Sequence, residues 1–147
     1  MIFLFDVDGT LTPPRQHMTA EMVEVMDHTM RLVKVFLVSG SDLKKIKEQV
    51  PRNILKNCGG IFSCSANQFH IPSIEGYELQ YENEFIPDGK LVEQLEKLVE
   101  LSPYDTRTGN HIEHRPGMIN FSIVGRNATN EQRAEYYNWD KKTYERK

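Results

Sequence analysis

The first ten residues join an apolar run to a pair of carboxylates. Ile2 to Phe5 form a short continuous apolar stretch, and Asp6-Val7-Asp8-Gly9-Thr10 follows it directly. A run of this kind that stops at Asp and Gly is typical of a strand in a parallel sheet, buried on both faces and followed by its loop. We therefore predict a buried first strand with Asp6 and Asp8 at its carboxyl end, where doubly wound sheets place their active sites.

A second strand and two helices are predicted next. Val35 to Val38 repeat the continuous apolar pattern and end at Ser39-Gly40-Ser41-Asp42. Between the two strands, Thr19 is suited to cap a helix whose apolar residues recur with a spacing of about 3.6. Another helix is predicted from Leu43 to Val50, where Pro51 ends it. Alternating strands and helices favour an α/β fold with parallel crossovers.

The remainder of the chain is predicted to mix strands and helices. The expected elements are a third strand, an antiparallel hairpin, a helix, a second hairpin around Pro116-Gly117 and a last helix capped by Thr129, over residues 60–64, 67–85, 91–99, 111–124 and 129 onward. Pro87-Asp88-Gly89 is a turn signal and marks the best candidate boundary. We accordingly expect an α/β core over residues 1–86 and an α+β module over residues 87–147.

Two aspartates two residues apart suit phosphoryl transfer. The carboxylate of Asp6 can attack phosphorus to form an aspartyl-phosphate, and Asp8 can exchange a proton with the entering or leaving oxygen. Because two carboxylates repel an incoming phosphate, a divalent cation, Mg²⁺ in preference, is expected to bridge them. Gly9 lets the backbone turn sharply, and Thr10 offers a hydroxyl and an N–H to a phosphate oxygen. The alternatives are a polar turn that only caps the strand and a fragment of a calcium loop.

Charge and composition argue against several other classes of protein. The net charge of −3 gives no bulk attraction to nucleic acid or to an anionic membrane, so neither is expected as a partner. Cys58 and Cys64 are too few for a disulfide framework and fit no metal-binding spacing. The apolar start meets Asp6 after five residues, too early for a signal peptide or a membrane span, so a cytoplasmic location is expected.

These motifs together resemble the haloacid-dehalogenase superfamily, in which an apolar strand ending in DxDGT is the first motif and a Ser or Thr after the second strand is the second. The resemblance implies a Rossmann-like parallel core with Asp6 as nucleophile and Asp8 as general acid/base. It also implies Mg²⁺ held by Asp6 and by the backbone carbonyl of Asp8. Ser39 or Ser41 would hold the transferring phosphoryl group, and Thr10 would bind a phosphate oxygen beside it.

Longer stretches are similar to the eukaryotic-type phosphomannomutase family. They are FLFDVDGTLTPPR from Phe3 to Arg15, SGSDLKKIKEQV from Ser39 to Val50, and the IEHRPGMINFSIVGR pattern that starts at Ile112. The resemblance implies interconversion of hexose 6-phosphate and hexose 1-phosphate, with mannose preferred, through an aspartyl-phosphate. It further implies that residues 87–147 form a substrate-recognition cap, and that caps pair into a homodimer. The substrate-binding arginines that carry over are Arg15, Arg107, Arg115 and Arg126, whose guanidinium groups suit phosphate.

The family also has two later motifs that this sequence does not show, a lysine that stabilises the phosphoaspartate and acidic residues that complete the metal site. Both core and cap are therefore expected to be incomplete over these 147 residues, and little or no mutase activity is expected from the chain alone. A shortened relative, a fragment of a longer product and a partner-completed subunit are all consistent with this. Two other functions stay open: a sugar phosphatase of the same superfamily, and a non-catalytic relative that binds a sugar phosphate or a protein.

Overall fold

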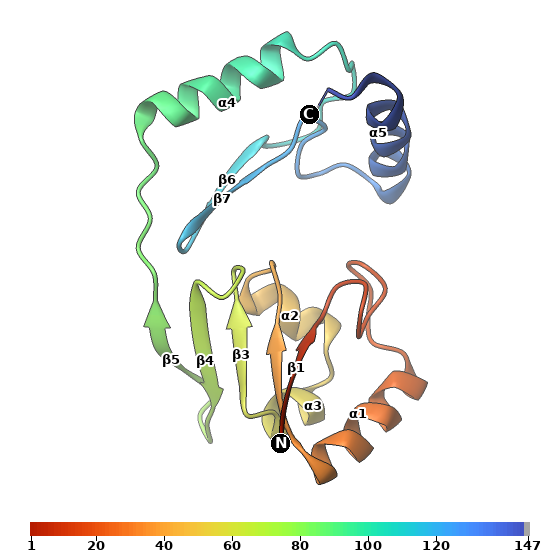
Figure 1. Cartoon of the computed structure of the whole chain (residues 1–147), viewed down its shortest axis with the longest axis vertical. Coiled ribbons are helices and arrows are strands. Elements are labelled where there is room, and N and C mark those ends of the chain that lie inside the picture. Colours follow the sequence, from red (N-terminus) through yellow and green to blue (C-terminus); the bar gives the residue numbers. More distant parts are fainter. Residues whose placement is uncertain (146–147) are drawn as a thin grey trace. The chain divides into compact units, whose positions relative to one another are not determined.

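The first apolar run forms strand β1 (Ile2–Asp6), which pairs in parallel with β2 (Lys34–Val38) along its whole length. The fold is described by a computed structural model that covers residues 1–145, so the last two residues of the predicted 87–147 module lie outside the described residues (Figure 1). The chain divides into two compact units. One comprises residues 1–85 with 116–118, and the other comprises residues 86–115 with 119 onward.

Short polar caps start the helices of the first unit. Its remaining elements are, in chain order, α1 (Ala20–Leu32), α2 (Leu43–Gln49), α3 (Arg52–Asn57), β3 (Gly60–Ser63), β4 (Gln68–Pro72) and β5 (Tyr77–Glu82). Thr19 caps α1 as predicted, because its hydroxyl accepts from the N–H of Met22 at 3.3 Å. Asp42 caps α2 through the N–H of Lys45 at 2.8 Å. The short helix α3 is not predicted from the sequence, where Pro51 indicates only the end of the preceding helix; its fixed φ is equally compatible with the start of another.

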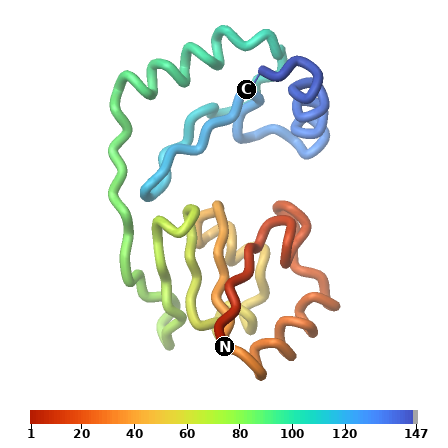
Figure 2. Tube along the Cα trace, in the orientation of Figure 1, coloured from red at the N-terminus to blue at the C-terminus, as the bar shows by residue number. Residues whose placement is uncertain are grey.

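The first unit is built on a five-stranded sheet with the order β1-β2-β3-β4-β5. β1, β2 and β3 are parallel, β4 pairs antiparallel with β3, and β5 pairs antiparallel with β4, as the hairpin predicted over residues 67–85 requires. A bulge between Phe69 and His70 shifts the register of the last pair. Figure 2 follows the chain through this sheet, from the red first strand to the green fifth. The sequence-based prediction of an α/β fold with a parallel core is confirmed.

The two faces of the sheet are covered differently. One face packs against the three helices around a core whose buried apolar residues include Met26, Ile46, Ile54, Val35, Leu37 and Ile61. Within each strand, the residues that alternate with the buried ones point to the other face of the sheet. That face carries a row of partly exposed aromatic rings. The ring centroids of Phe36 and Phe62 are 6.2 Å apart, those of Phe62 and Phe69 4.4 Å, and those of Phe69 and Tyr81 6.1 Å. This aromatic row stabilises β2 to β5 across the strands.

β1 is not the buried strand that its sequence predicts. It lies at the edge of the sheet and, among residues 1–145, pairs only with β2. Its Ile2 and Leu4 side chains are 65% and 58% exposed, whereas β2, with a strand on each side, buries Val35 and Leu37. The expectation failed because an apolar run fits a strand that is covered on both faces, and the pattern alone does not say which neighbours are present.

The elements beyond β5 are two helices and a hairpin. They are α4 (Gly89–Leu101), β6 (Ile112–Arg115), β7 (Met118–Phe121) and α5 (Asn130–Thr143). β6 and β7 pair as a two-stranded sheet joined at Pro116-Gly117, as predicted, and Gly117 adopts a φ of 67° that favours glycine. Thr129 caps α5, where it forms a capping box with Gln132. Among residues 1–145, no helix combines the length and apolar character needed to cross a membrane.

Candidate active site

The turn after β1 carries three of the predicted site residues. The backbone N–H of Thr10 donates to the carbonyl of Val7 at 3.3 Å, and Gly9 adopts a φ of 83°, a left-handed conformation that residues with side chains rarely take. This tight turn keeps Asp6, Asp8 and Thr10 at the carboxyl end of the strand. The hydroxyl of Thr10 donates to the Asp6 carboxylate at 3.2 Å.

Four hydrogen-bond donors converge on the carboxylate of Asp8. Its Oδ1 accepts from the backbone N–H of Arg15 at 3.0 Å and from Nε2 of Gln49 at 2.7 Å. Its Oδ2 accepts from the hydroxyls of Ser39 and Ser41, each at 3.4 Å. The structure therefore brings together Asp8 and the two predicted serines from the loop after β2. Gln49 is an additional contact that the sequence does not predict.

These contacts determine the ionisation of Asp8. Partial burial acts to raise the pKa of Asp8, but the hydrogen bonds from Arg15, Gln49, Ser41 and Ser39 favour the carboxylate more strongly and hold the pKa below its usual value. Arg15 meets Asp8 through its backbone, which has a φ of 62°, while its own side chain is exposed. Asp8 is therefore an ionised, oriented carboxylate at neutral pH.

A strained turn after β3 packs against the loop that carries the two serines. Cys64, Ser65 and Ala66 adopt φ angles of 51°, 55° and 65°, three consecutive residues in the left-handed region. The N–H of Cys64 donates to the carbonyl of Ser41 and that of Ser65 to the carbonyl of Ser39, both at 2.9 Å. Left-handed residues with side chains are unfavourable and persist where the surrounding structure holds them, often at functional sites. The turn fixes the backbone on which the serine hydroxyls are mounted.

The strand end has oxygen atoms suited to Mg²⁺. This ion takes oxygen ligands and is commonly bound through one or two carboxylates together with water. The Asp6 carboxylate is exposed at the end of β1, and the Asp8 carbonyl follows two residues later. Among residues 1–145, no three His, Cys, Asp or Glu side chains gather into a metal-binding group. The donor set that fits a cation here is thus the exposed carboxylate of Asp6 with the backbone oxygen of Asp8.

In the second unit, Glu113 joins two of the predicted arginines. One oxygen of its carboxylate lies 2.9 Å from Nη2 of Arg115 and 3.0 Å from Nε of Arg126. The side chains of Arg115 and Arg126 are only 10% and 22% exposed, so the ion pairs lie in a partly desolvated position. Two guanidinium groups on one carboxylate leave a net positive charge, which suits an anion such as phosphate.

A cavity of about 280 Å³ adjoins Arg126. Its lining residues come from β7, α5 and the segment between them: Phe121, Ser122, Ile123, Val124, Arg126, Arg133, Tyr136 and Tyr137. Arg133 is not among the residues predicted from the sequence. Its Nε donates to the carbonyl of Ala128 at 3.1 Å and its Nη2 to that of Arg126 at 3.0 Å. Arg133 therefore holds the backbone of the loop from which Arg126 projects.

Arg107 binds backbone carbonyl groups. Its guanidinium donates to the carbonyls of Val99 at 2.9 Å, Ser102 at 3.1 Å and Thr106 at 3.2 Å, and also to that of Tyr104. These bonds tie the carboxyl end of α4 to the segment that follows it, where helix carbonyls lack intrahelical partners. The contacts give Arg107 a structural role, and its predicted role in substrate binding stays a prediction.

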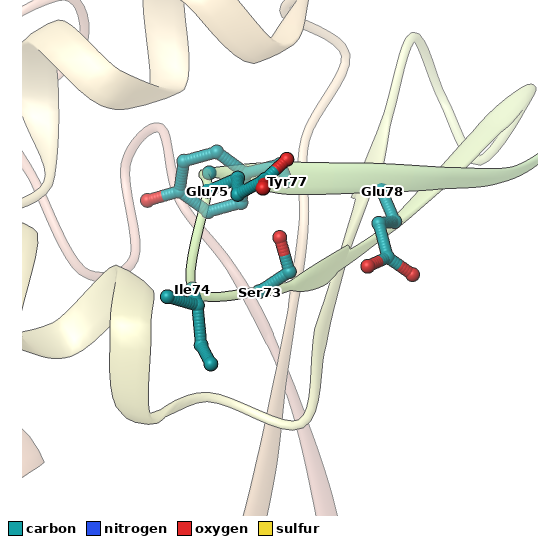
Figure 3. Close-up of a pocket in the computed structure, with 6 residues that line it drawn as sticks. Ser73, Ile74, Glu75, Tyr77 and Glu78 are labelled. Carbon is teal, nitrogen blue, oxygen red and sulfur yellow. The ribbon is translucent and has the colours of Figure 1, made fainter.

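A larger hollow of about 680 Å³ lies at the turn between β4 and β5. It is lined by Ser73, Ile74, Glu75, Gly76, Tyr77 and Glu78. Because β4 runs antiparallel to β3, this turn is at the end of the sheet opposite to Asp6 and Asp8. Figure 3 shows that Glu78 lies apart from Glu75, so the two carboxylates do not converge. The hollow is therefore separate from the carboxylates of Asp6 and Asp8 despite its size.

Comparison with known proteins identifies the family. The family described as eukaryotic phosphomannomutase matches residues 22–147. A phosphomannomutase from Spinacia oleracea is 37% identical over 96% of this chain, and a probable phosphomannomutase from Caenorhabditis elegans is 34% identical over the same share. The chain spans 58% of the length of each of these relatives.

The solved structures include a haloacid dehalogenase-like hydrolase from B. subtilis. That protein has 21% sequence identity and a TM-score of 0.46, over 67% of this chain and 33% of its own. The family match covers most of the chain and includes the stretch with Arg115 and Arg126. The chain therefore belongs to the eukaryotic phosphomannomutase family.

Proposed function

We propose that Asp6 and Asp8 transfer a phosphoryl group on a sugar phosphate, and that the chain thereby serves to interconvert hexose 6-phosphate and hexose 1-phosphate. The observation that carries the proposal is the convergence of Ser39 and Ser41 on Asp8, at the adjacent carboxyl ends of β1 and β2. Asp6, at the end of β1, has an exposed carboxylate available for attack. The relatives' name, phosphomannomutase, supports mannose as the sugar.

The reaction follows from the two carboxylates. With Asp6 phosphorylated by a hexose bisphosphate, the ionised Asp8 takes the proton from a hydroxyl of the hexose phosphate, whose oxygen attacks the phosphoaspartate and releases Asp6. An oxygen of Asp6 then attacks the other phosphorus of the resulting bisphosphate, the bond to the sugar oxygen breaks, and Asp8 gives that oxygen the proton. Thr10 and Ser39 or Ser41 would donate hydrogen bonds to the phosphoryl oxygens. Mg²⁺ held by Asp6 and the Asp8 carbonyl would supply positive charge that offsets the charge on the phosphate.

We further propose that the second unit recognises the phosphate that is not reacting. Glu113 holds Arg115 and Arg126 side by side, and charge-assisted bonds from paired guanidinium groups are strong phosphate contacts. Pairing of two copies of the chain would use α4, which leaves Leu91, Leu98 and Leu101 exposed.

Replacement of the nucleophile tests the reaction. The purified chain is incubated with mannose 1-phosphate, Mg²⁺ and a hexose bisphosphate, and isomerised sugar and free phosphate are measured. We expect Asp6→Asn to abolish transfer, because an amide does not attack phosphorus as a carboxylate does. The substituted chain should keep its fold, since Asp6 is exposed and the change removes one of two neighbouring negative charges.

The products distinguish the related functions. Isomerised sugar supports the mutase, free phosphate alone supports a phosphatase, and neither product supports a chain that only binds its ligand. Transfer by Asp6→Asn at more than a few per cent of the original rate would contradict the aspartyl-phosphate mechanism.

A further inference from the structure

Gln49 is a buried polar side chain at the end of α2, and its amide reaches the site. Its side chain lies among core residues and is only 3% exposed. Nε2 lies 2.7 Å from Oδ1 of Asp8 and 3.5 Å from Oγ1 of Thr12. Of the four contacts to the Asp8 carboxylate, this is the shortest, and it comes from a residue 41 positions away in the sequence.

The chemistry of the two partners fixes the orientation of this amide. The Asp8 carboxylate is ionised and can only accept, and the hydroxyl of Thr12 donates its single proton to the carbonyl of Val7 at 3.3 Å. Both partners therefore require N–H donors, so Nε2 faces the site. Oε1 consequently faces away, and among residues 1–145 it has no hydrogen-bond partner although it is buried.

Stability alone does not account for a glutamine at this position. A buried amide oxygen without a partner is unfavourable, and an apolar side chain of the same length would avoid that cost. Asp8 is also partly accessible and already accepts from Arg15, Ser39 and Ser41, so it does not need Gln49 in order to be satisfied. Gln49 adds a short hydrogen bond from a backbone position that is itself held in place, since the backbone carbonyl of Gln49 accepts from the N–H of Met18 at 2.8 Å.

We infer that Gln49 is a positioning residue, which holds the Asp8 carboxylate in the orientation required for proton transfer to and from the sugar oxygen. The inference rests on the proposed function for its consequence in catalysis. Its effect on the structure does not depend on turnover. With the Gln49 amide present, Asp8 occupies one side-chain rotamer, and without the amide Asp8 moves among several.

Solution NMR tests the positioning directly. Three-bond couplings of Asp8 report whether its χ1 angle is fixed or averaged. In the unsubstituted chain we expect the couplings of one rotamer, and in Gln49→Met we expect averaged values. The thermal unfolding midpoint of Gln49→Met should be equal to or above that of the original chain, because the substitution removes the buried oxygen that lacks a partner.

Gln132→Met is the matched control, because the Gln132 side chain stabilises the start of α5 and does not contact Asp8. It should lower the unfolding midpoint and leave the Asp8 couplings unchanged. Unchanged Asp8 couplings in Gln49→Met, or a lower midpoint together with a single Asp8 rotamer, would show that Gln49 is a packing residue and overturn the inference.

The leaving group supplies a kinetic test. A sugar alkoxide needs a proton as it departs, whereas nitrophenolate leaves p-nitrophenyl phosphate without one, so the first release of nitrophenolate depends little on Asp8. Gln49→Met should lower kcat for a hexose phosphate by roughly 10²-fold, and change KM and the rate of nitrophenolate release in a single turnover by less than about threefold. Equal losses on both substrates would contradict the positioning role. If the unsubstituted chain shows no turnover, as its sequence leads us to expect for the mutase reaction, the Asp8 couplings still decide the inference.

Discussion

The arginines of the second unit have different partners, so their replacement should have different effects on substrate binding and on stability. Arg115 and Arg126 share Glu113 and are proposed to bind the distal phosphate. We expect Arg115→Met and Arg126→Met each to raise KM for a hexose phosphate about 10- to 100-fold, the effect of losing a charge-assisted contact. KM for p-nitrophenyl phosphate, which lacks a second anchor, should change little. Steady-state kinetics on the two substrates measure the difference.

Arg107→Met is the control for this comparison. Because Arg107 donates to carbonyls at the end of α4, its loss should lower the free energy of unfolding by about 1.5–3 kcal/mol without a selective change in KM. A selective rise in KM would instead support the substrate-binding role that the sequence predicts. Equal losses on both substrates in Arg115→Met and Arg126→Met would assign those two residues to structure.

Some residues of the site can be predicted from the sequence, and others cannot. Asp6 and Asp8 are predicted because strand and turn lie within ten residues. Ser39 and Ser41 are expected only through the resemblance to the haloacid-dehalogenase superfamily. Gln49 is missed because its contact with Asp8 is nonlocal. The available signal is its place on the apolar face of α2, three residues after Ile46 and one before Val50, where a polar side chain is unexpected.

Strands β3 and β4 carry a buried polar network. The hydroxyl of Ser63 donates to Oε1 of Gln68 at 3.0 Å, so it can only accept from Nε2 of His70, which lies 3.1 Å away. Burial lowers the pKa of His70 below its usual 6.5, while the negative charge of Glu82 opposes the change. The folded chain therefore favours a neutral His70 with its proton on Nε2.

This network predicts a pH dependence of stability. Below pH 6.5 the unfolded chain takes up a proton at His70 before the folded chain does, so the free energy of unfolding should fall as the pH drops from 7 toward 5. Denaturant titrations at a series of pH values measure the slope. In His70→Phe this part of the slope should disappear. An identical slope in both proteins would show that His70 is not its source.

Secondary structure is predicted well where the signals are local. The caps Thr19 and Thr129 mark the starts of α1 and α5, and Pro116-Gly117 marks the turn between β6 and β7. Helix α3 is missed because it is only six residues long and follows directly after a proline. The register bulge at Phe69 and His70 has no local signal, since register follows from the packing of whole strands.

At the scale of the whole molecule, the exposed edge of the sheet should govern association. Ile2 and Leu4 lie exposed on β1, and Leu4 pairs in register with Phe36 of the aromatic row. An apolar edge strand with unpaired backbone groups is a template for pairing with another chain. We expect the chain to self-associate as its concentration rises, and Leu4→Lys to reduce this. Light scattering across a concentration series measures the effect.

Ile74→Lys is the matched control for Leu4→Lys. It introduces the same charge at a fully exposed apolar residue, but in the β4–β5 turn and away from the β1 edge. It should leave self-association nearly unchanged. An equal reduction by both substitutions would mean that net charge, and not the edge of β1, governs association.

The left-handed turn at Cys64, Ser65 and Ala66 sets a limit on how the protein can be improved by selection or engineering. Glycine adopts this backbone conformation without steric cost, so stabilising substitutions are available at Ser65 and Ala66, whereas Cys64 is fully buried and glycine there would leave a cavity. The turn also holds the carbonyls of Ser39 and Ser41 through the N–H groups of Ser65 and Cys64, and glycine would make it more flexible. A screen for heat resistance and a screen for turnover should therefore favour opposite changes here, a stability–activity trade-off confined to one three-residue turn.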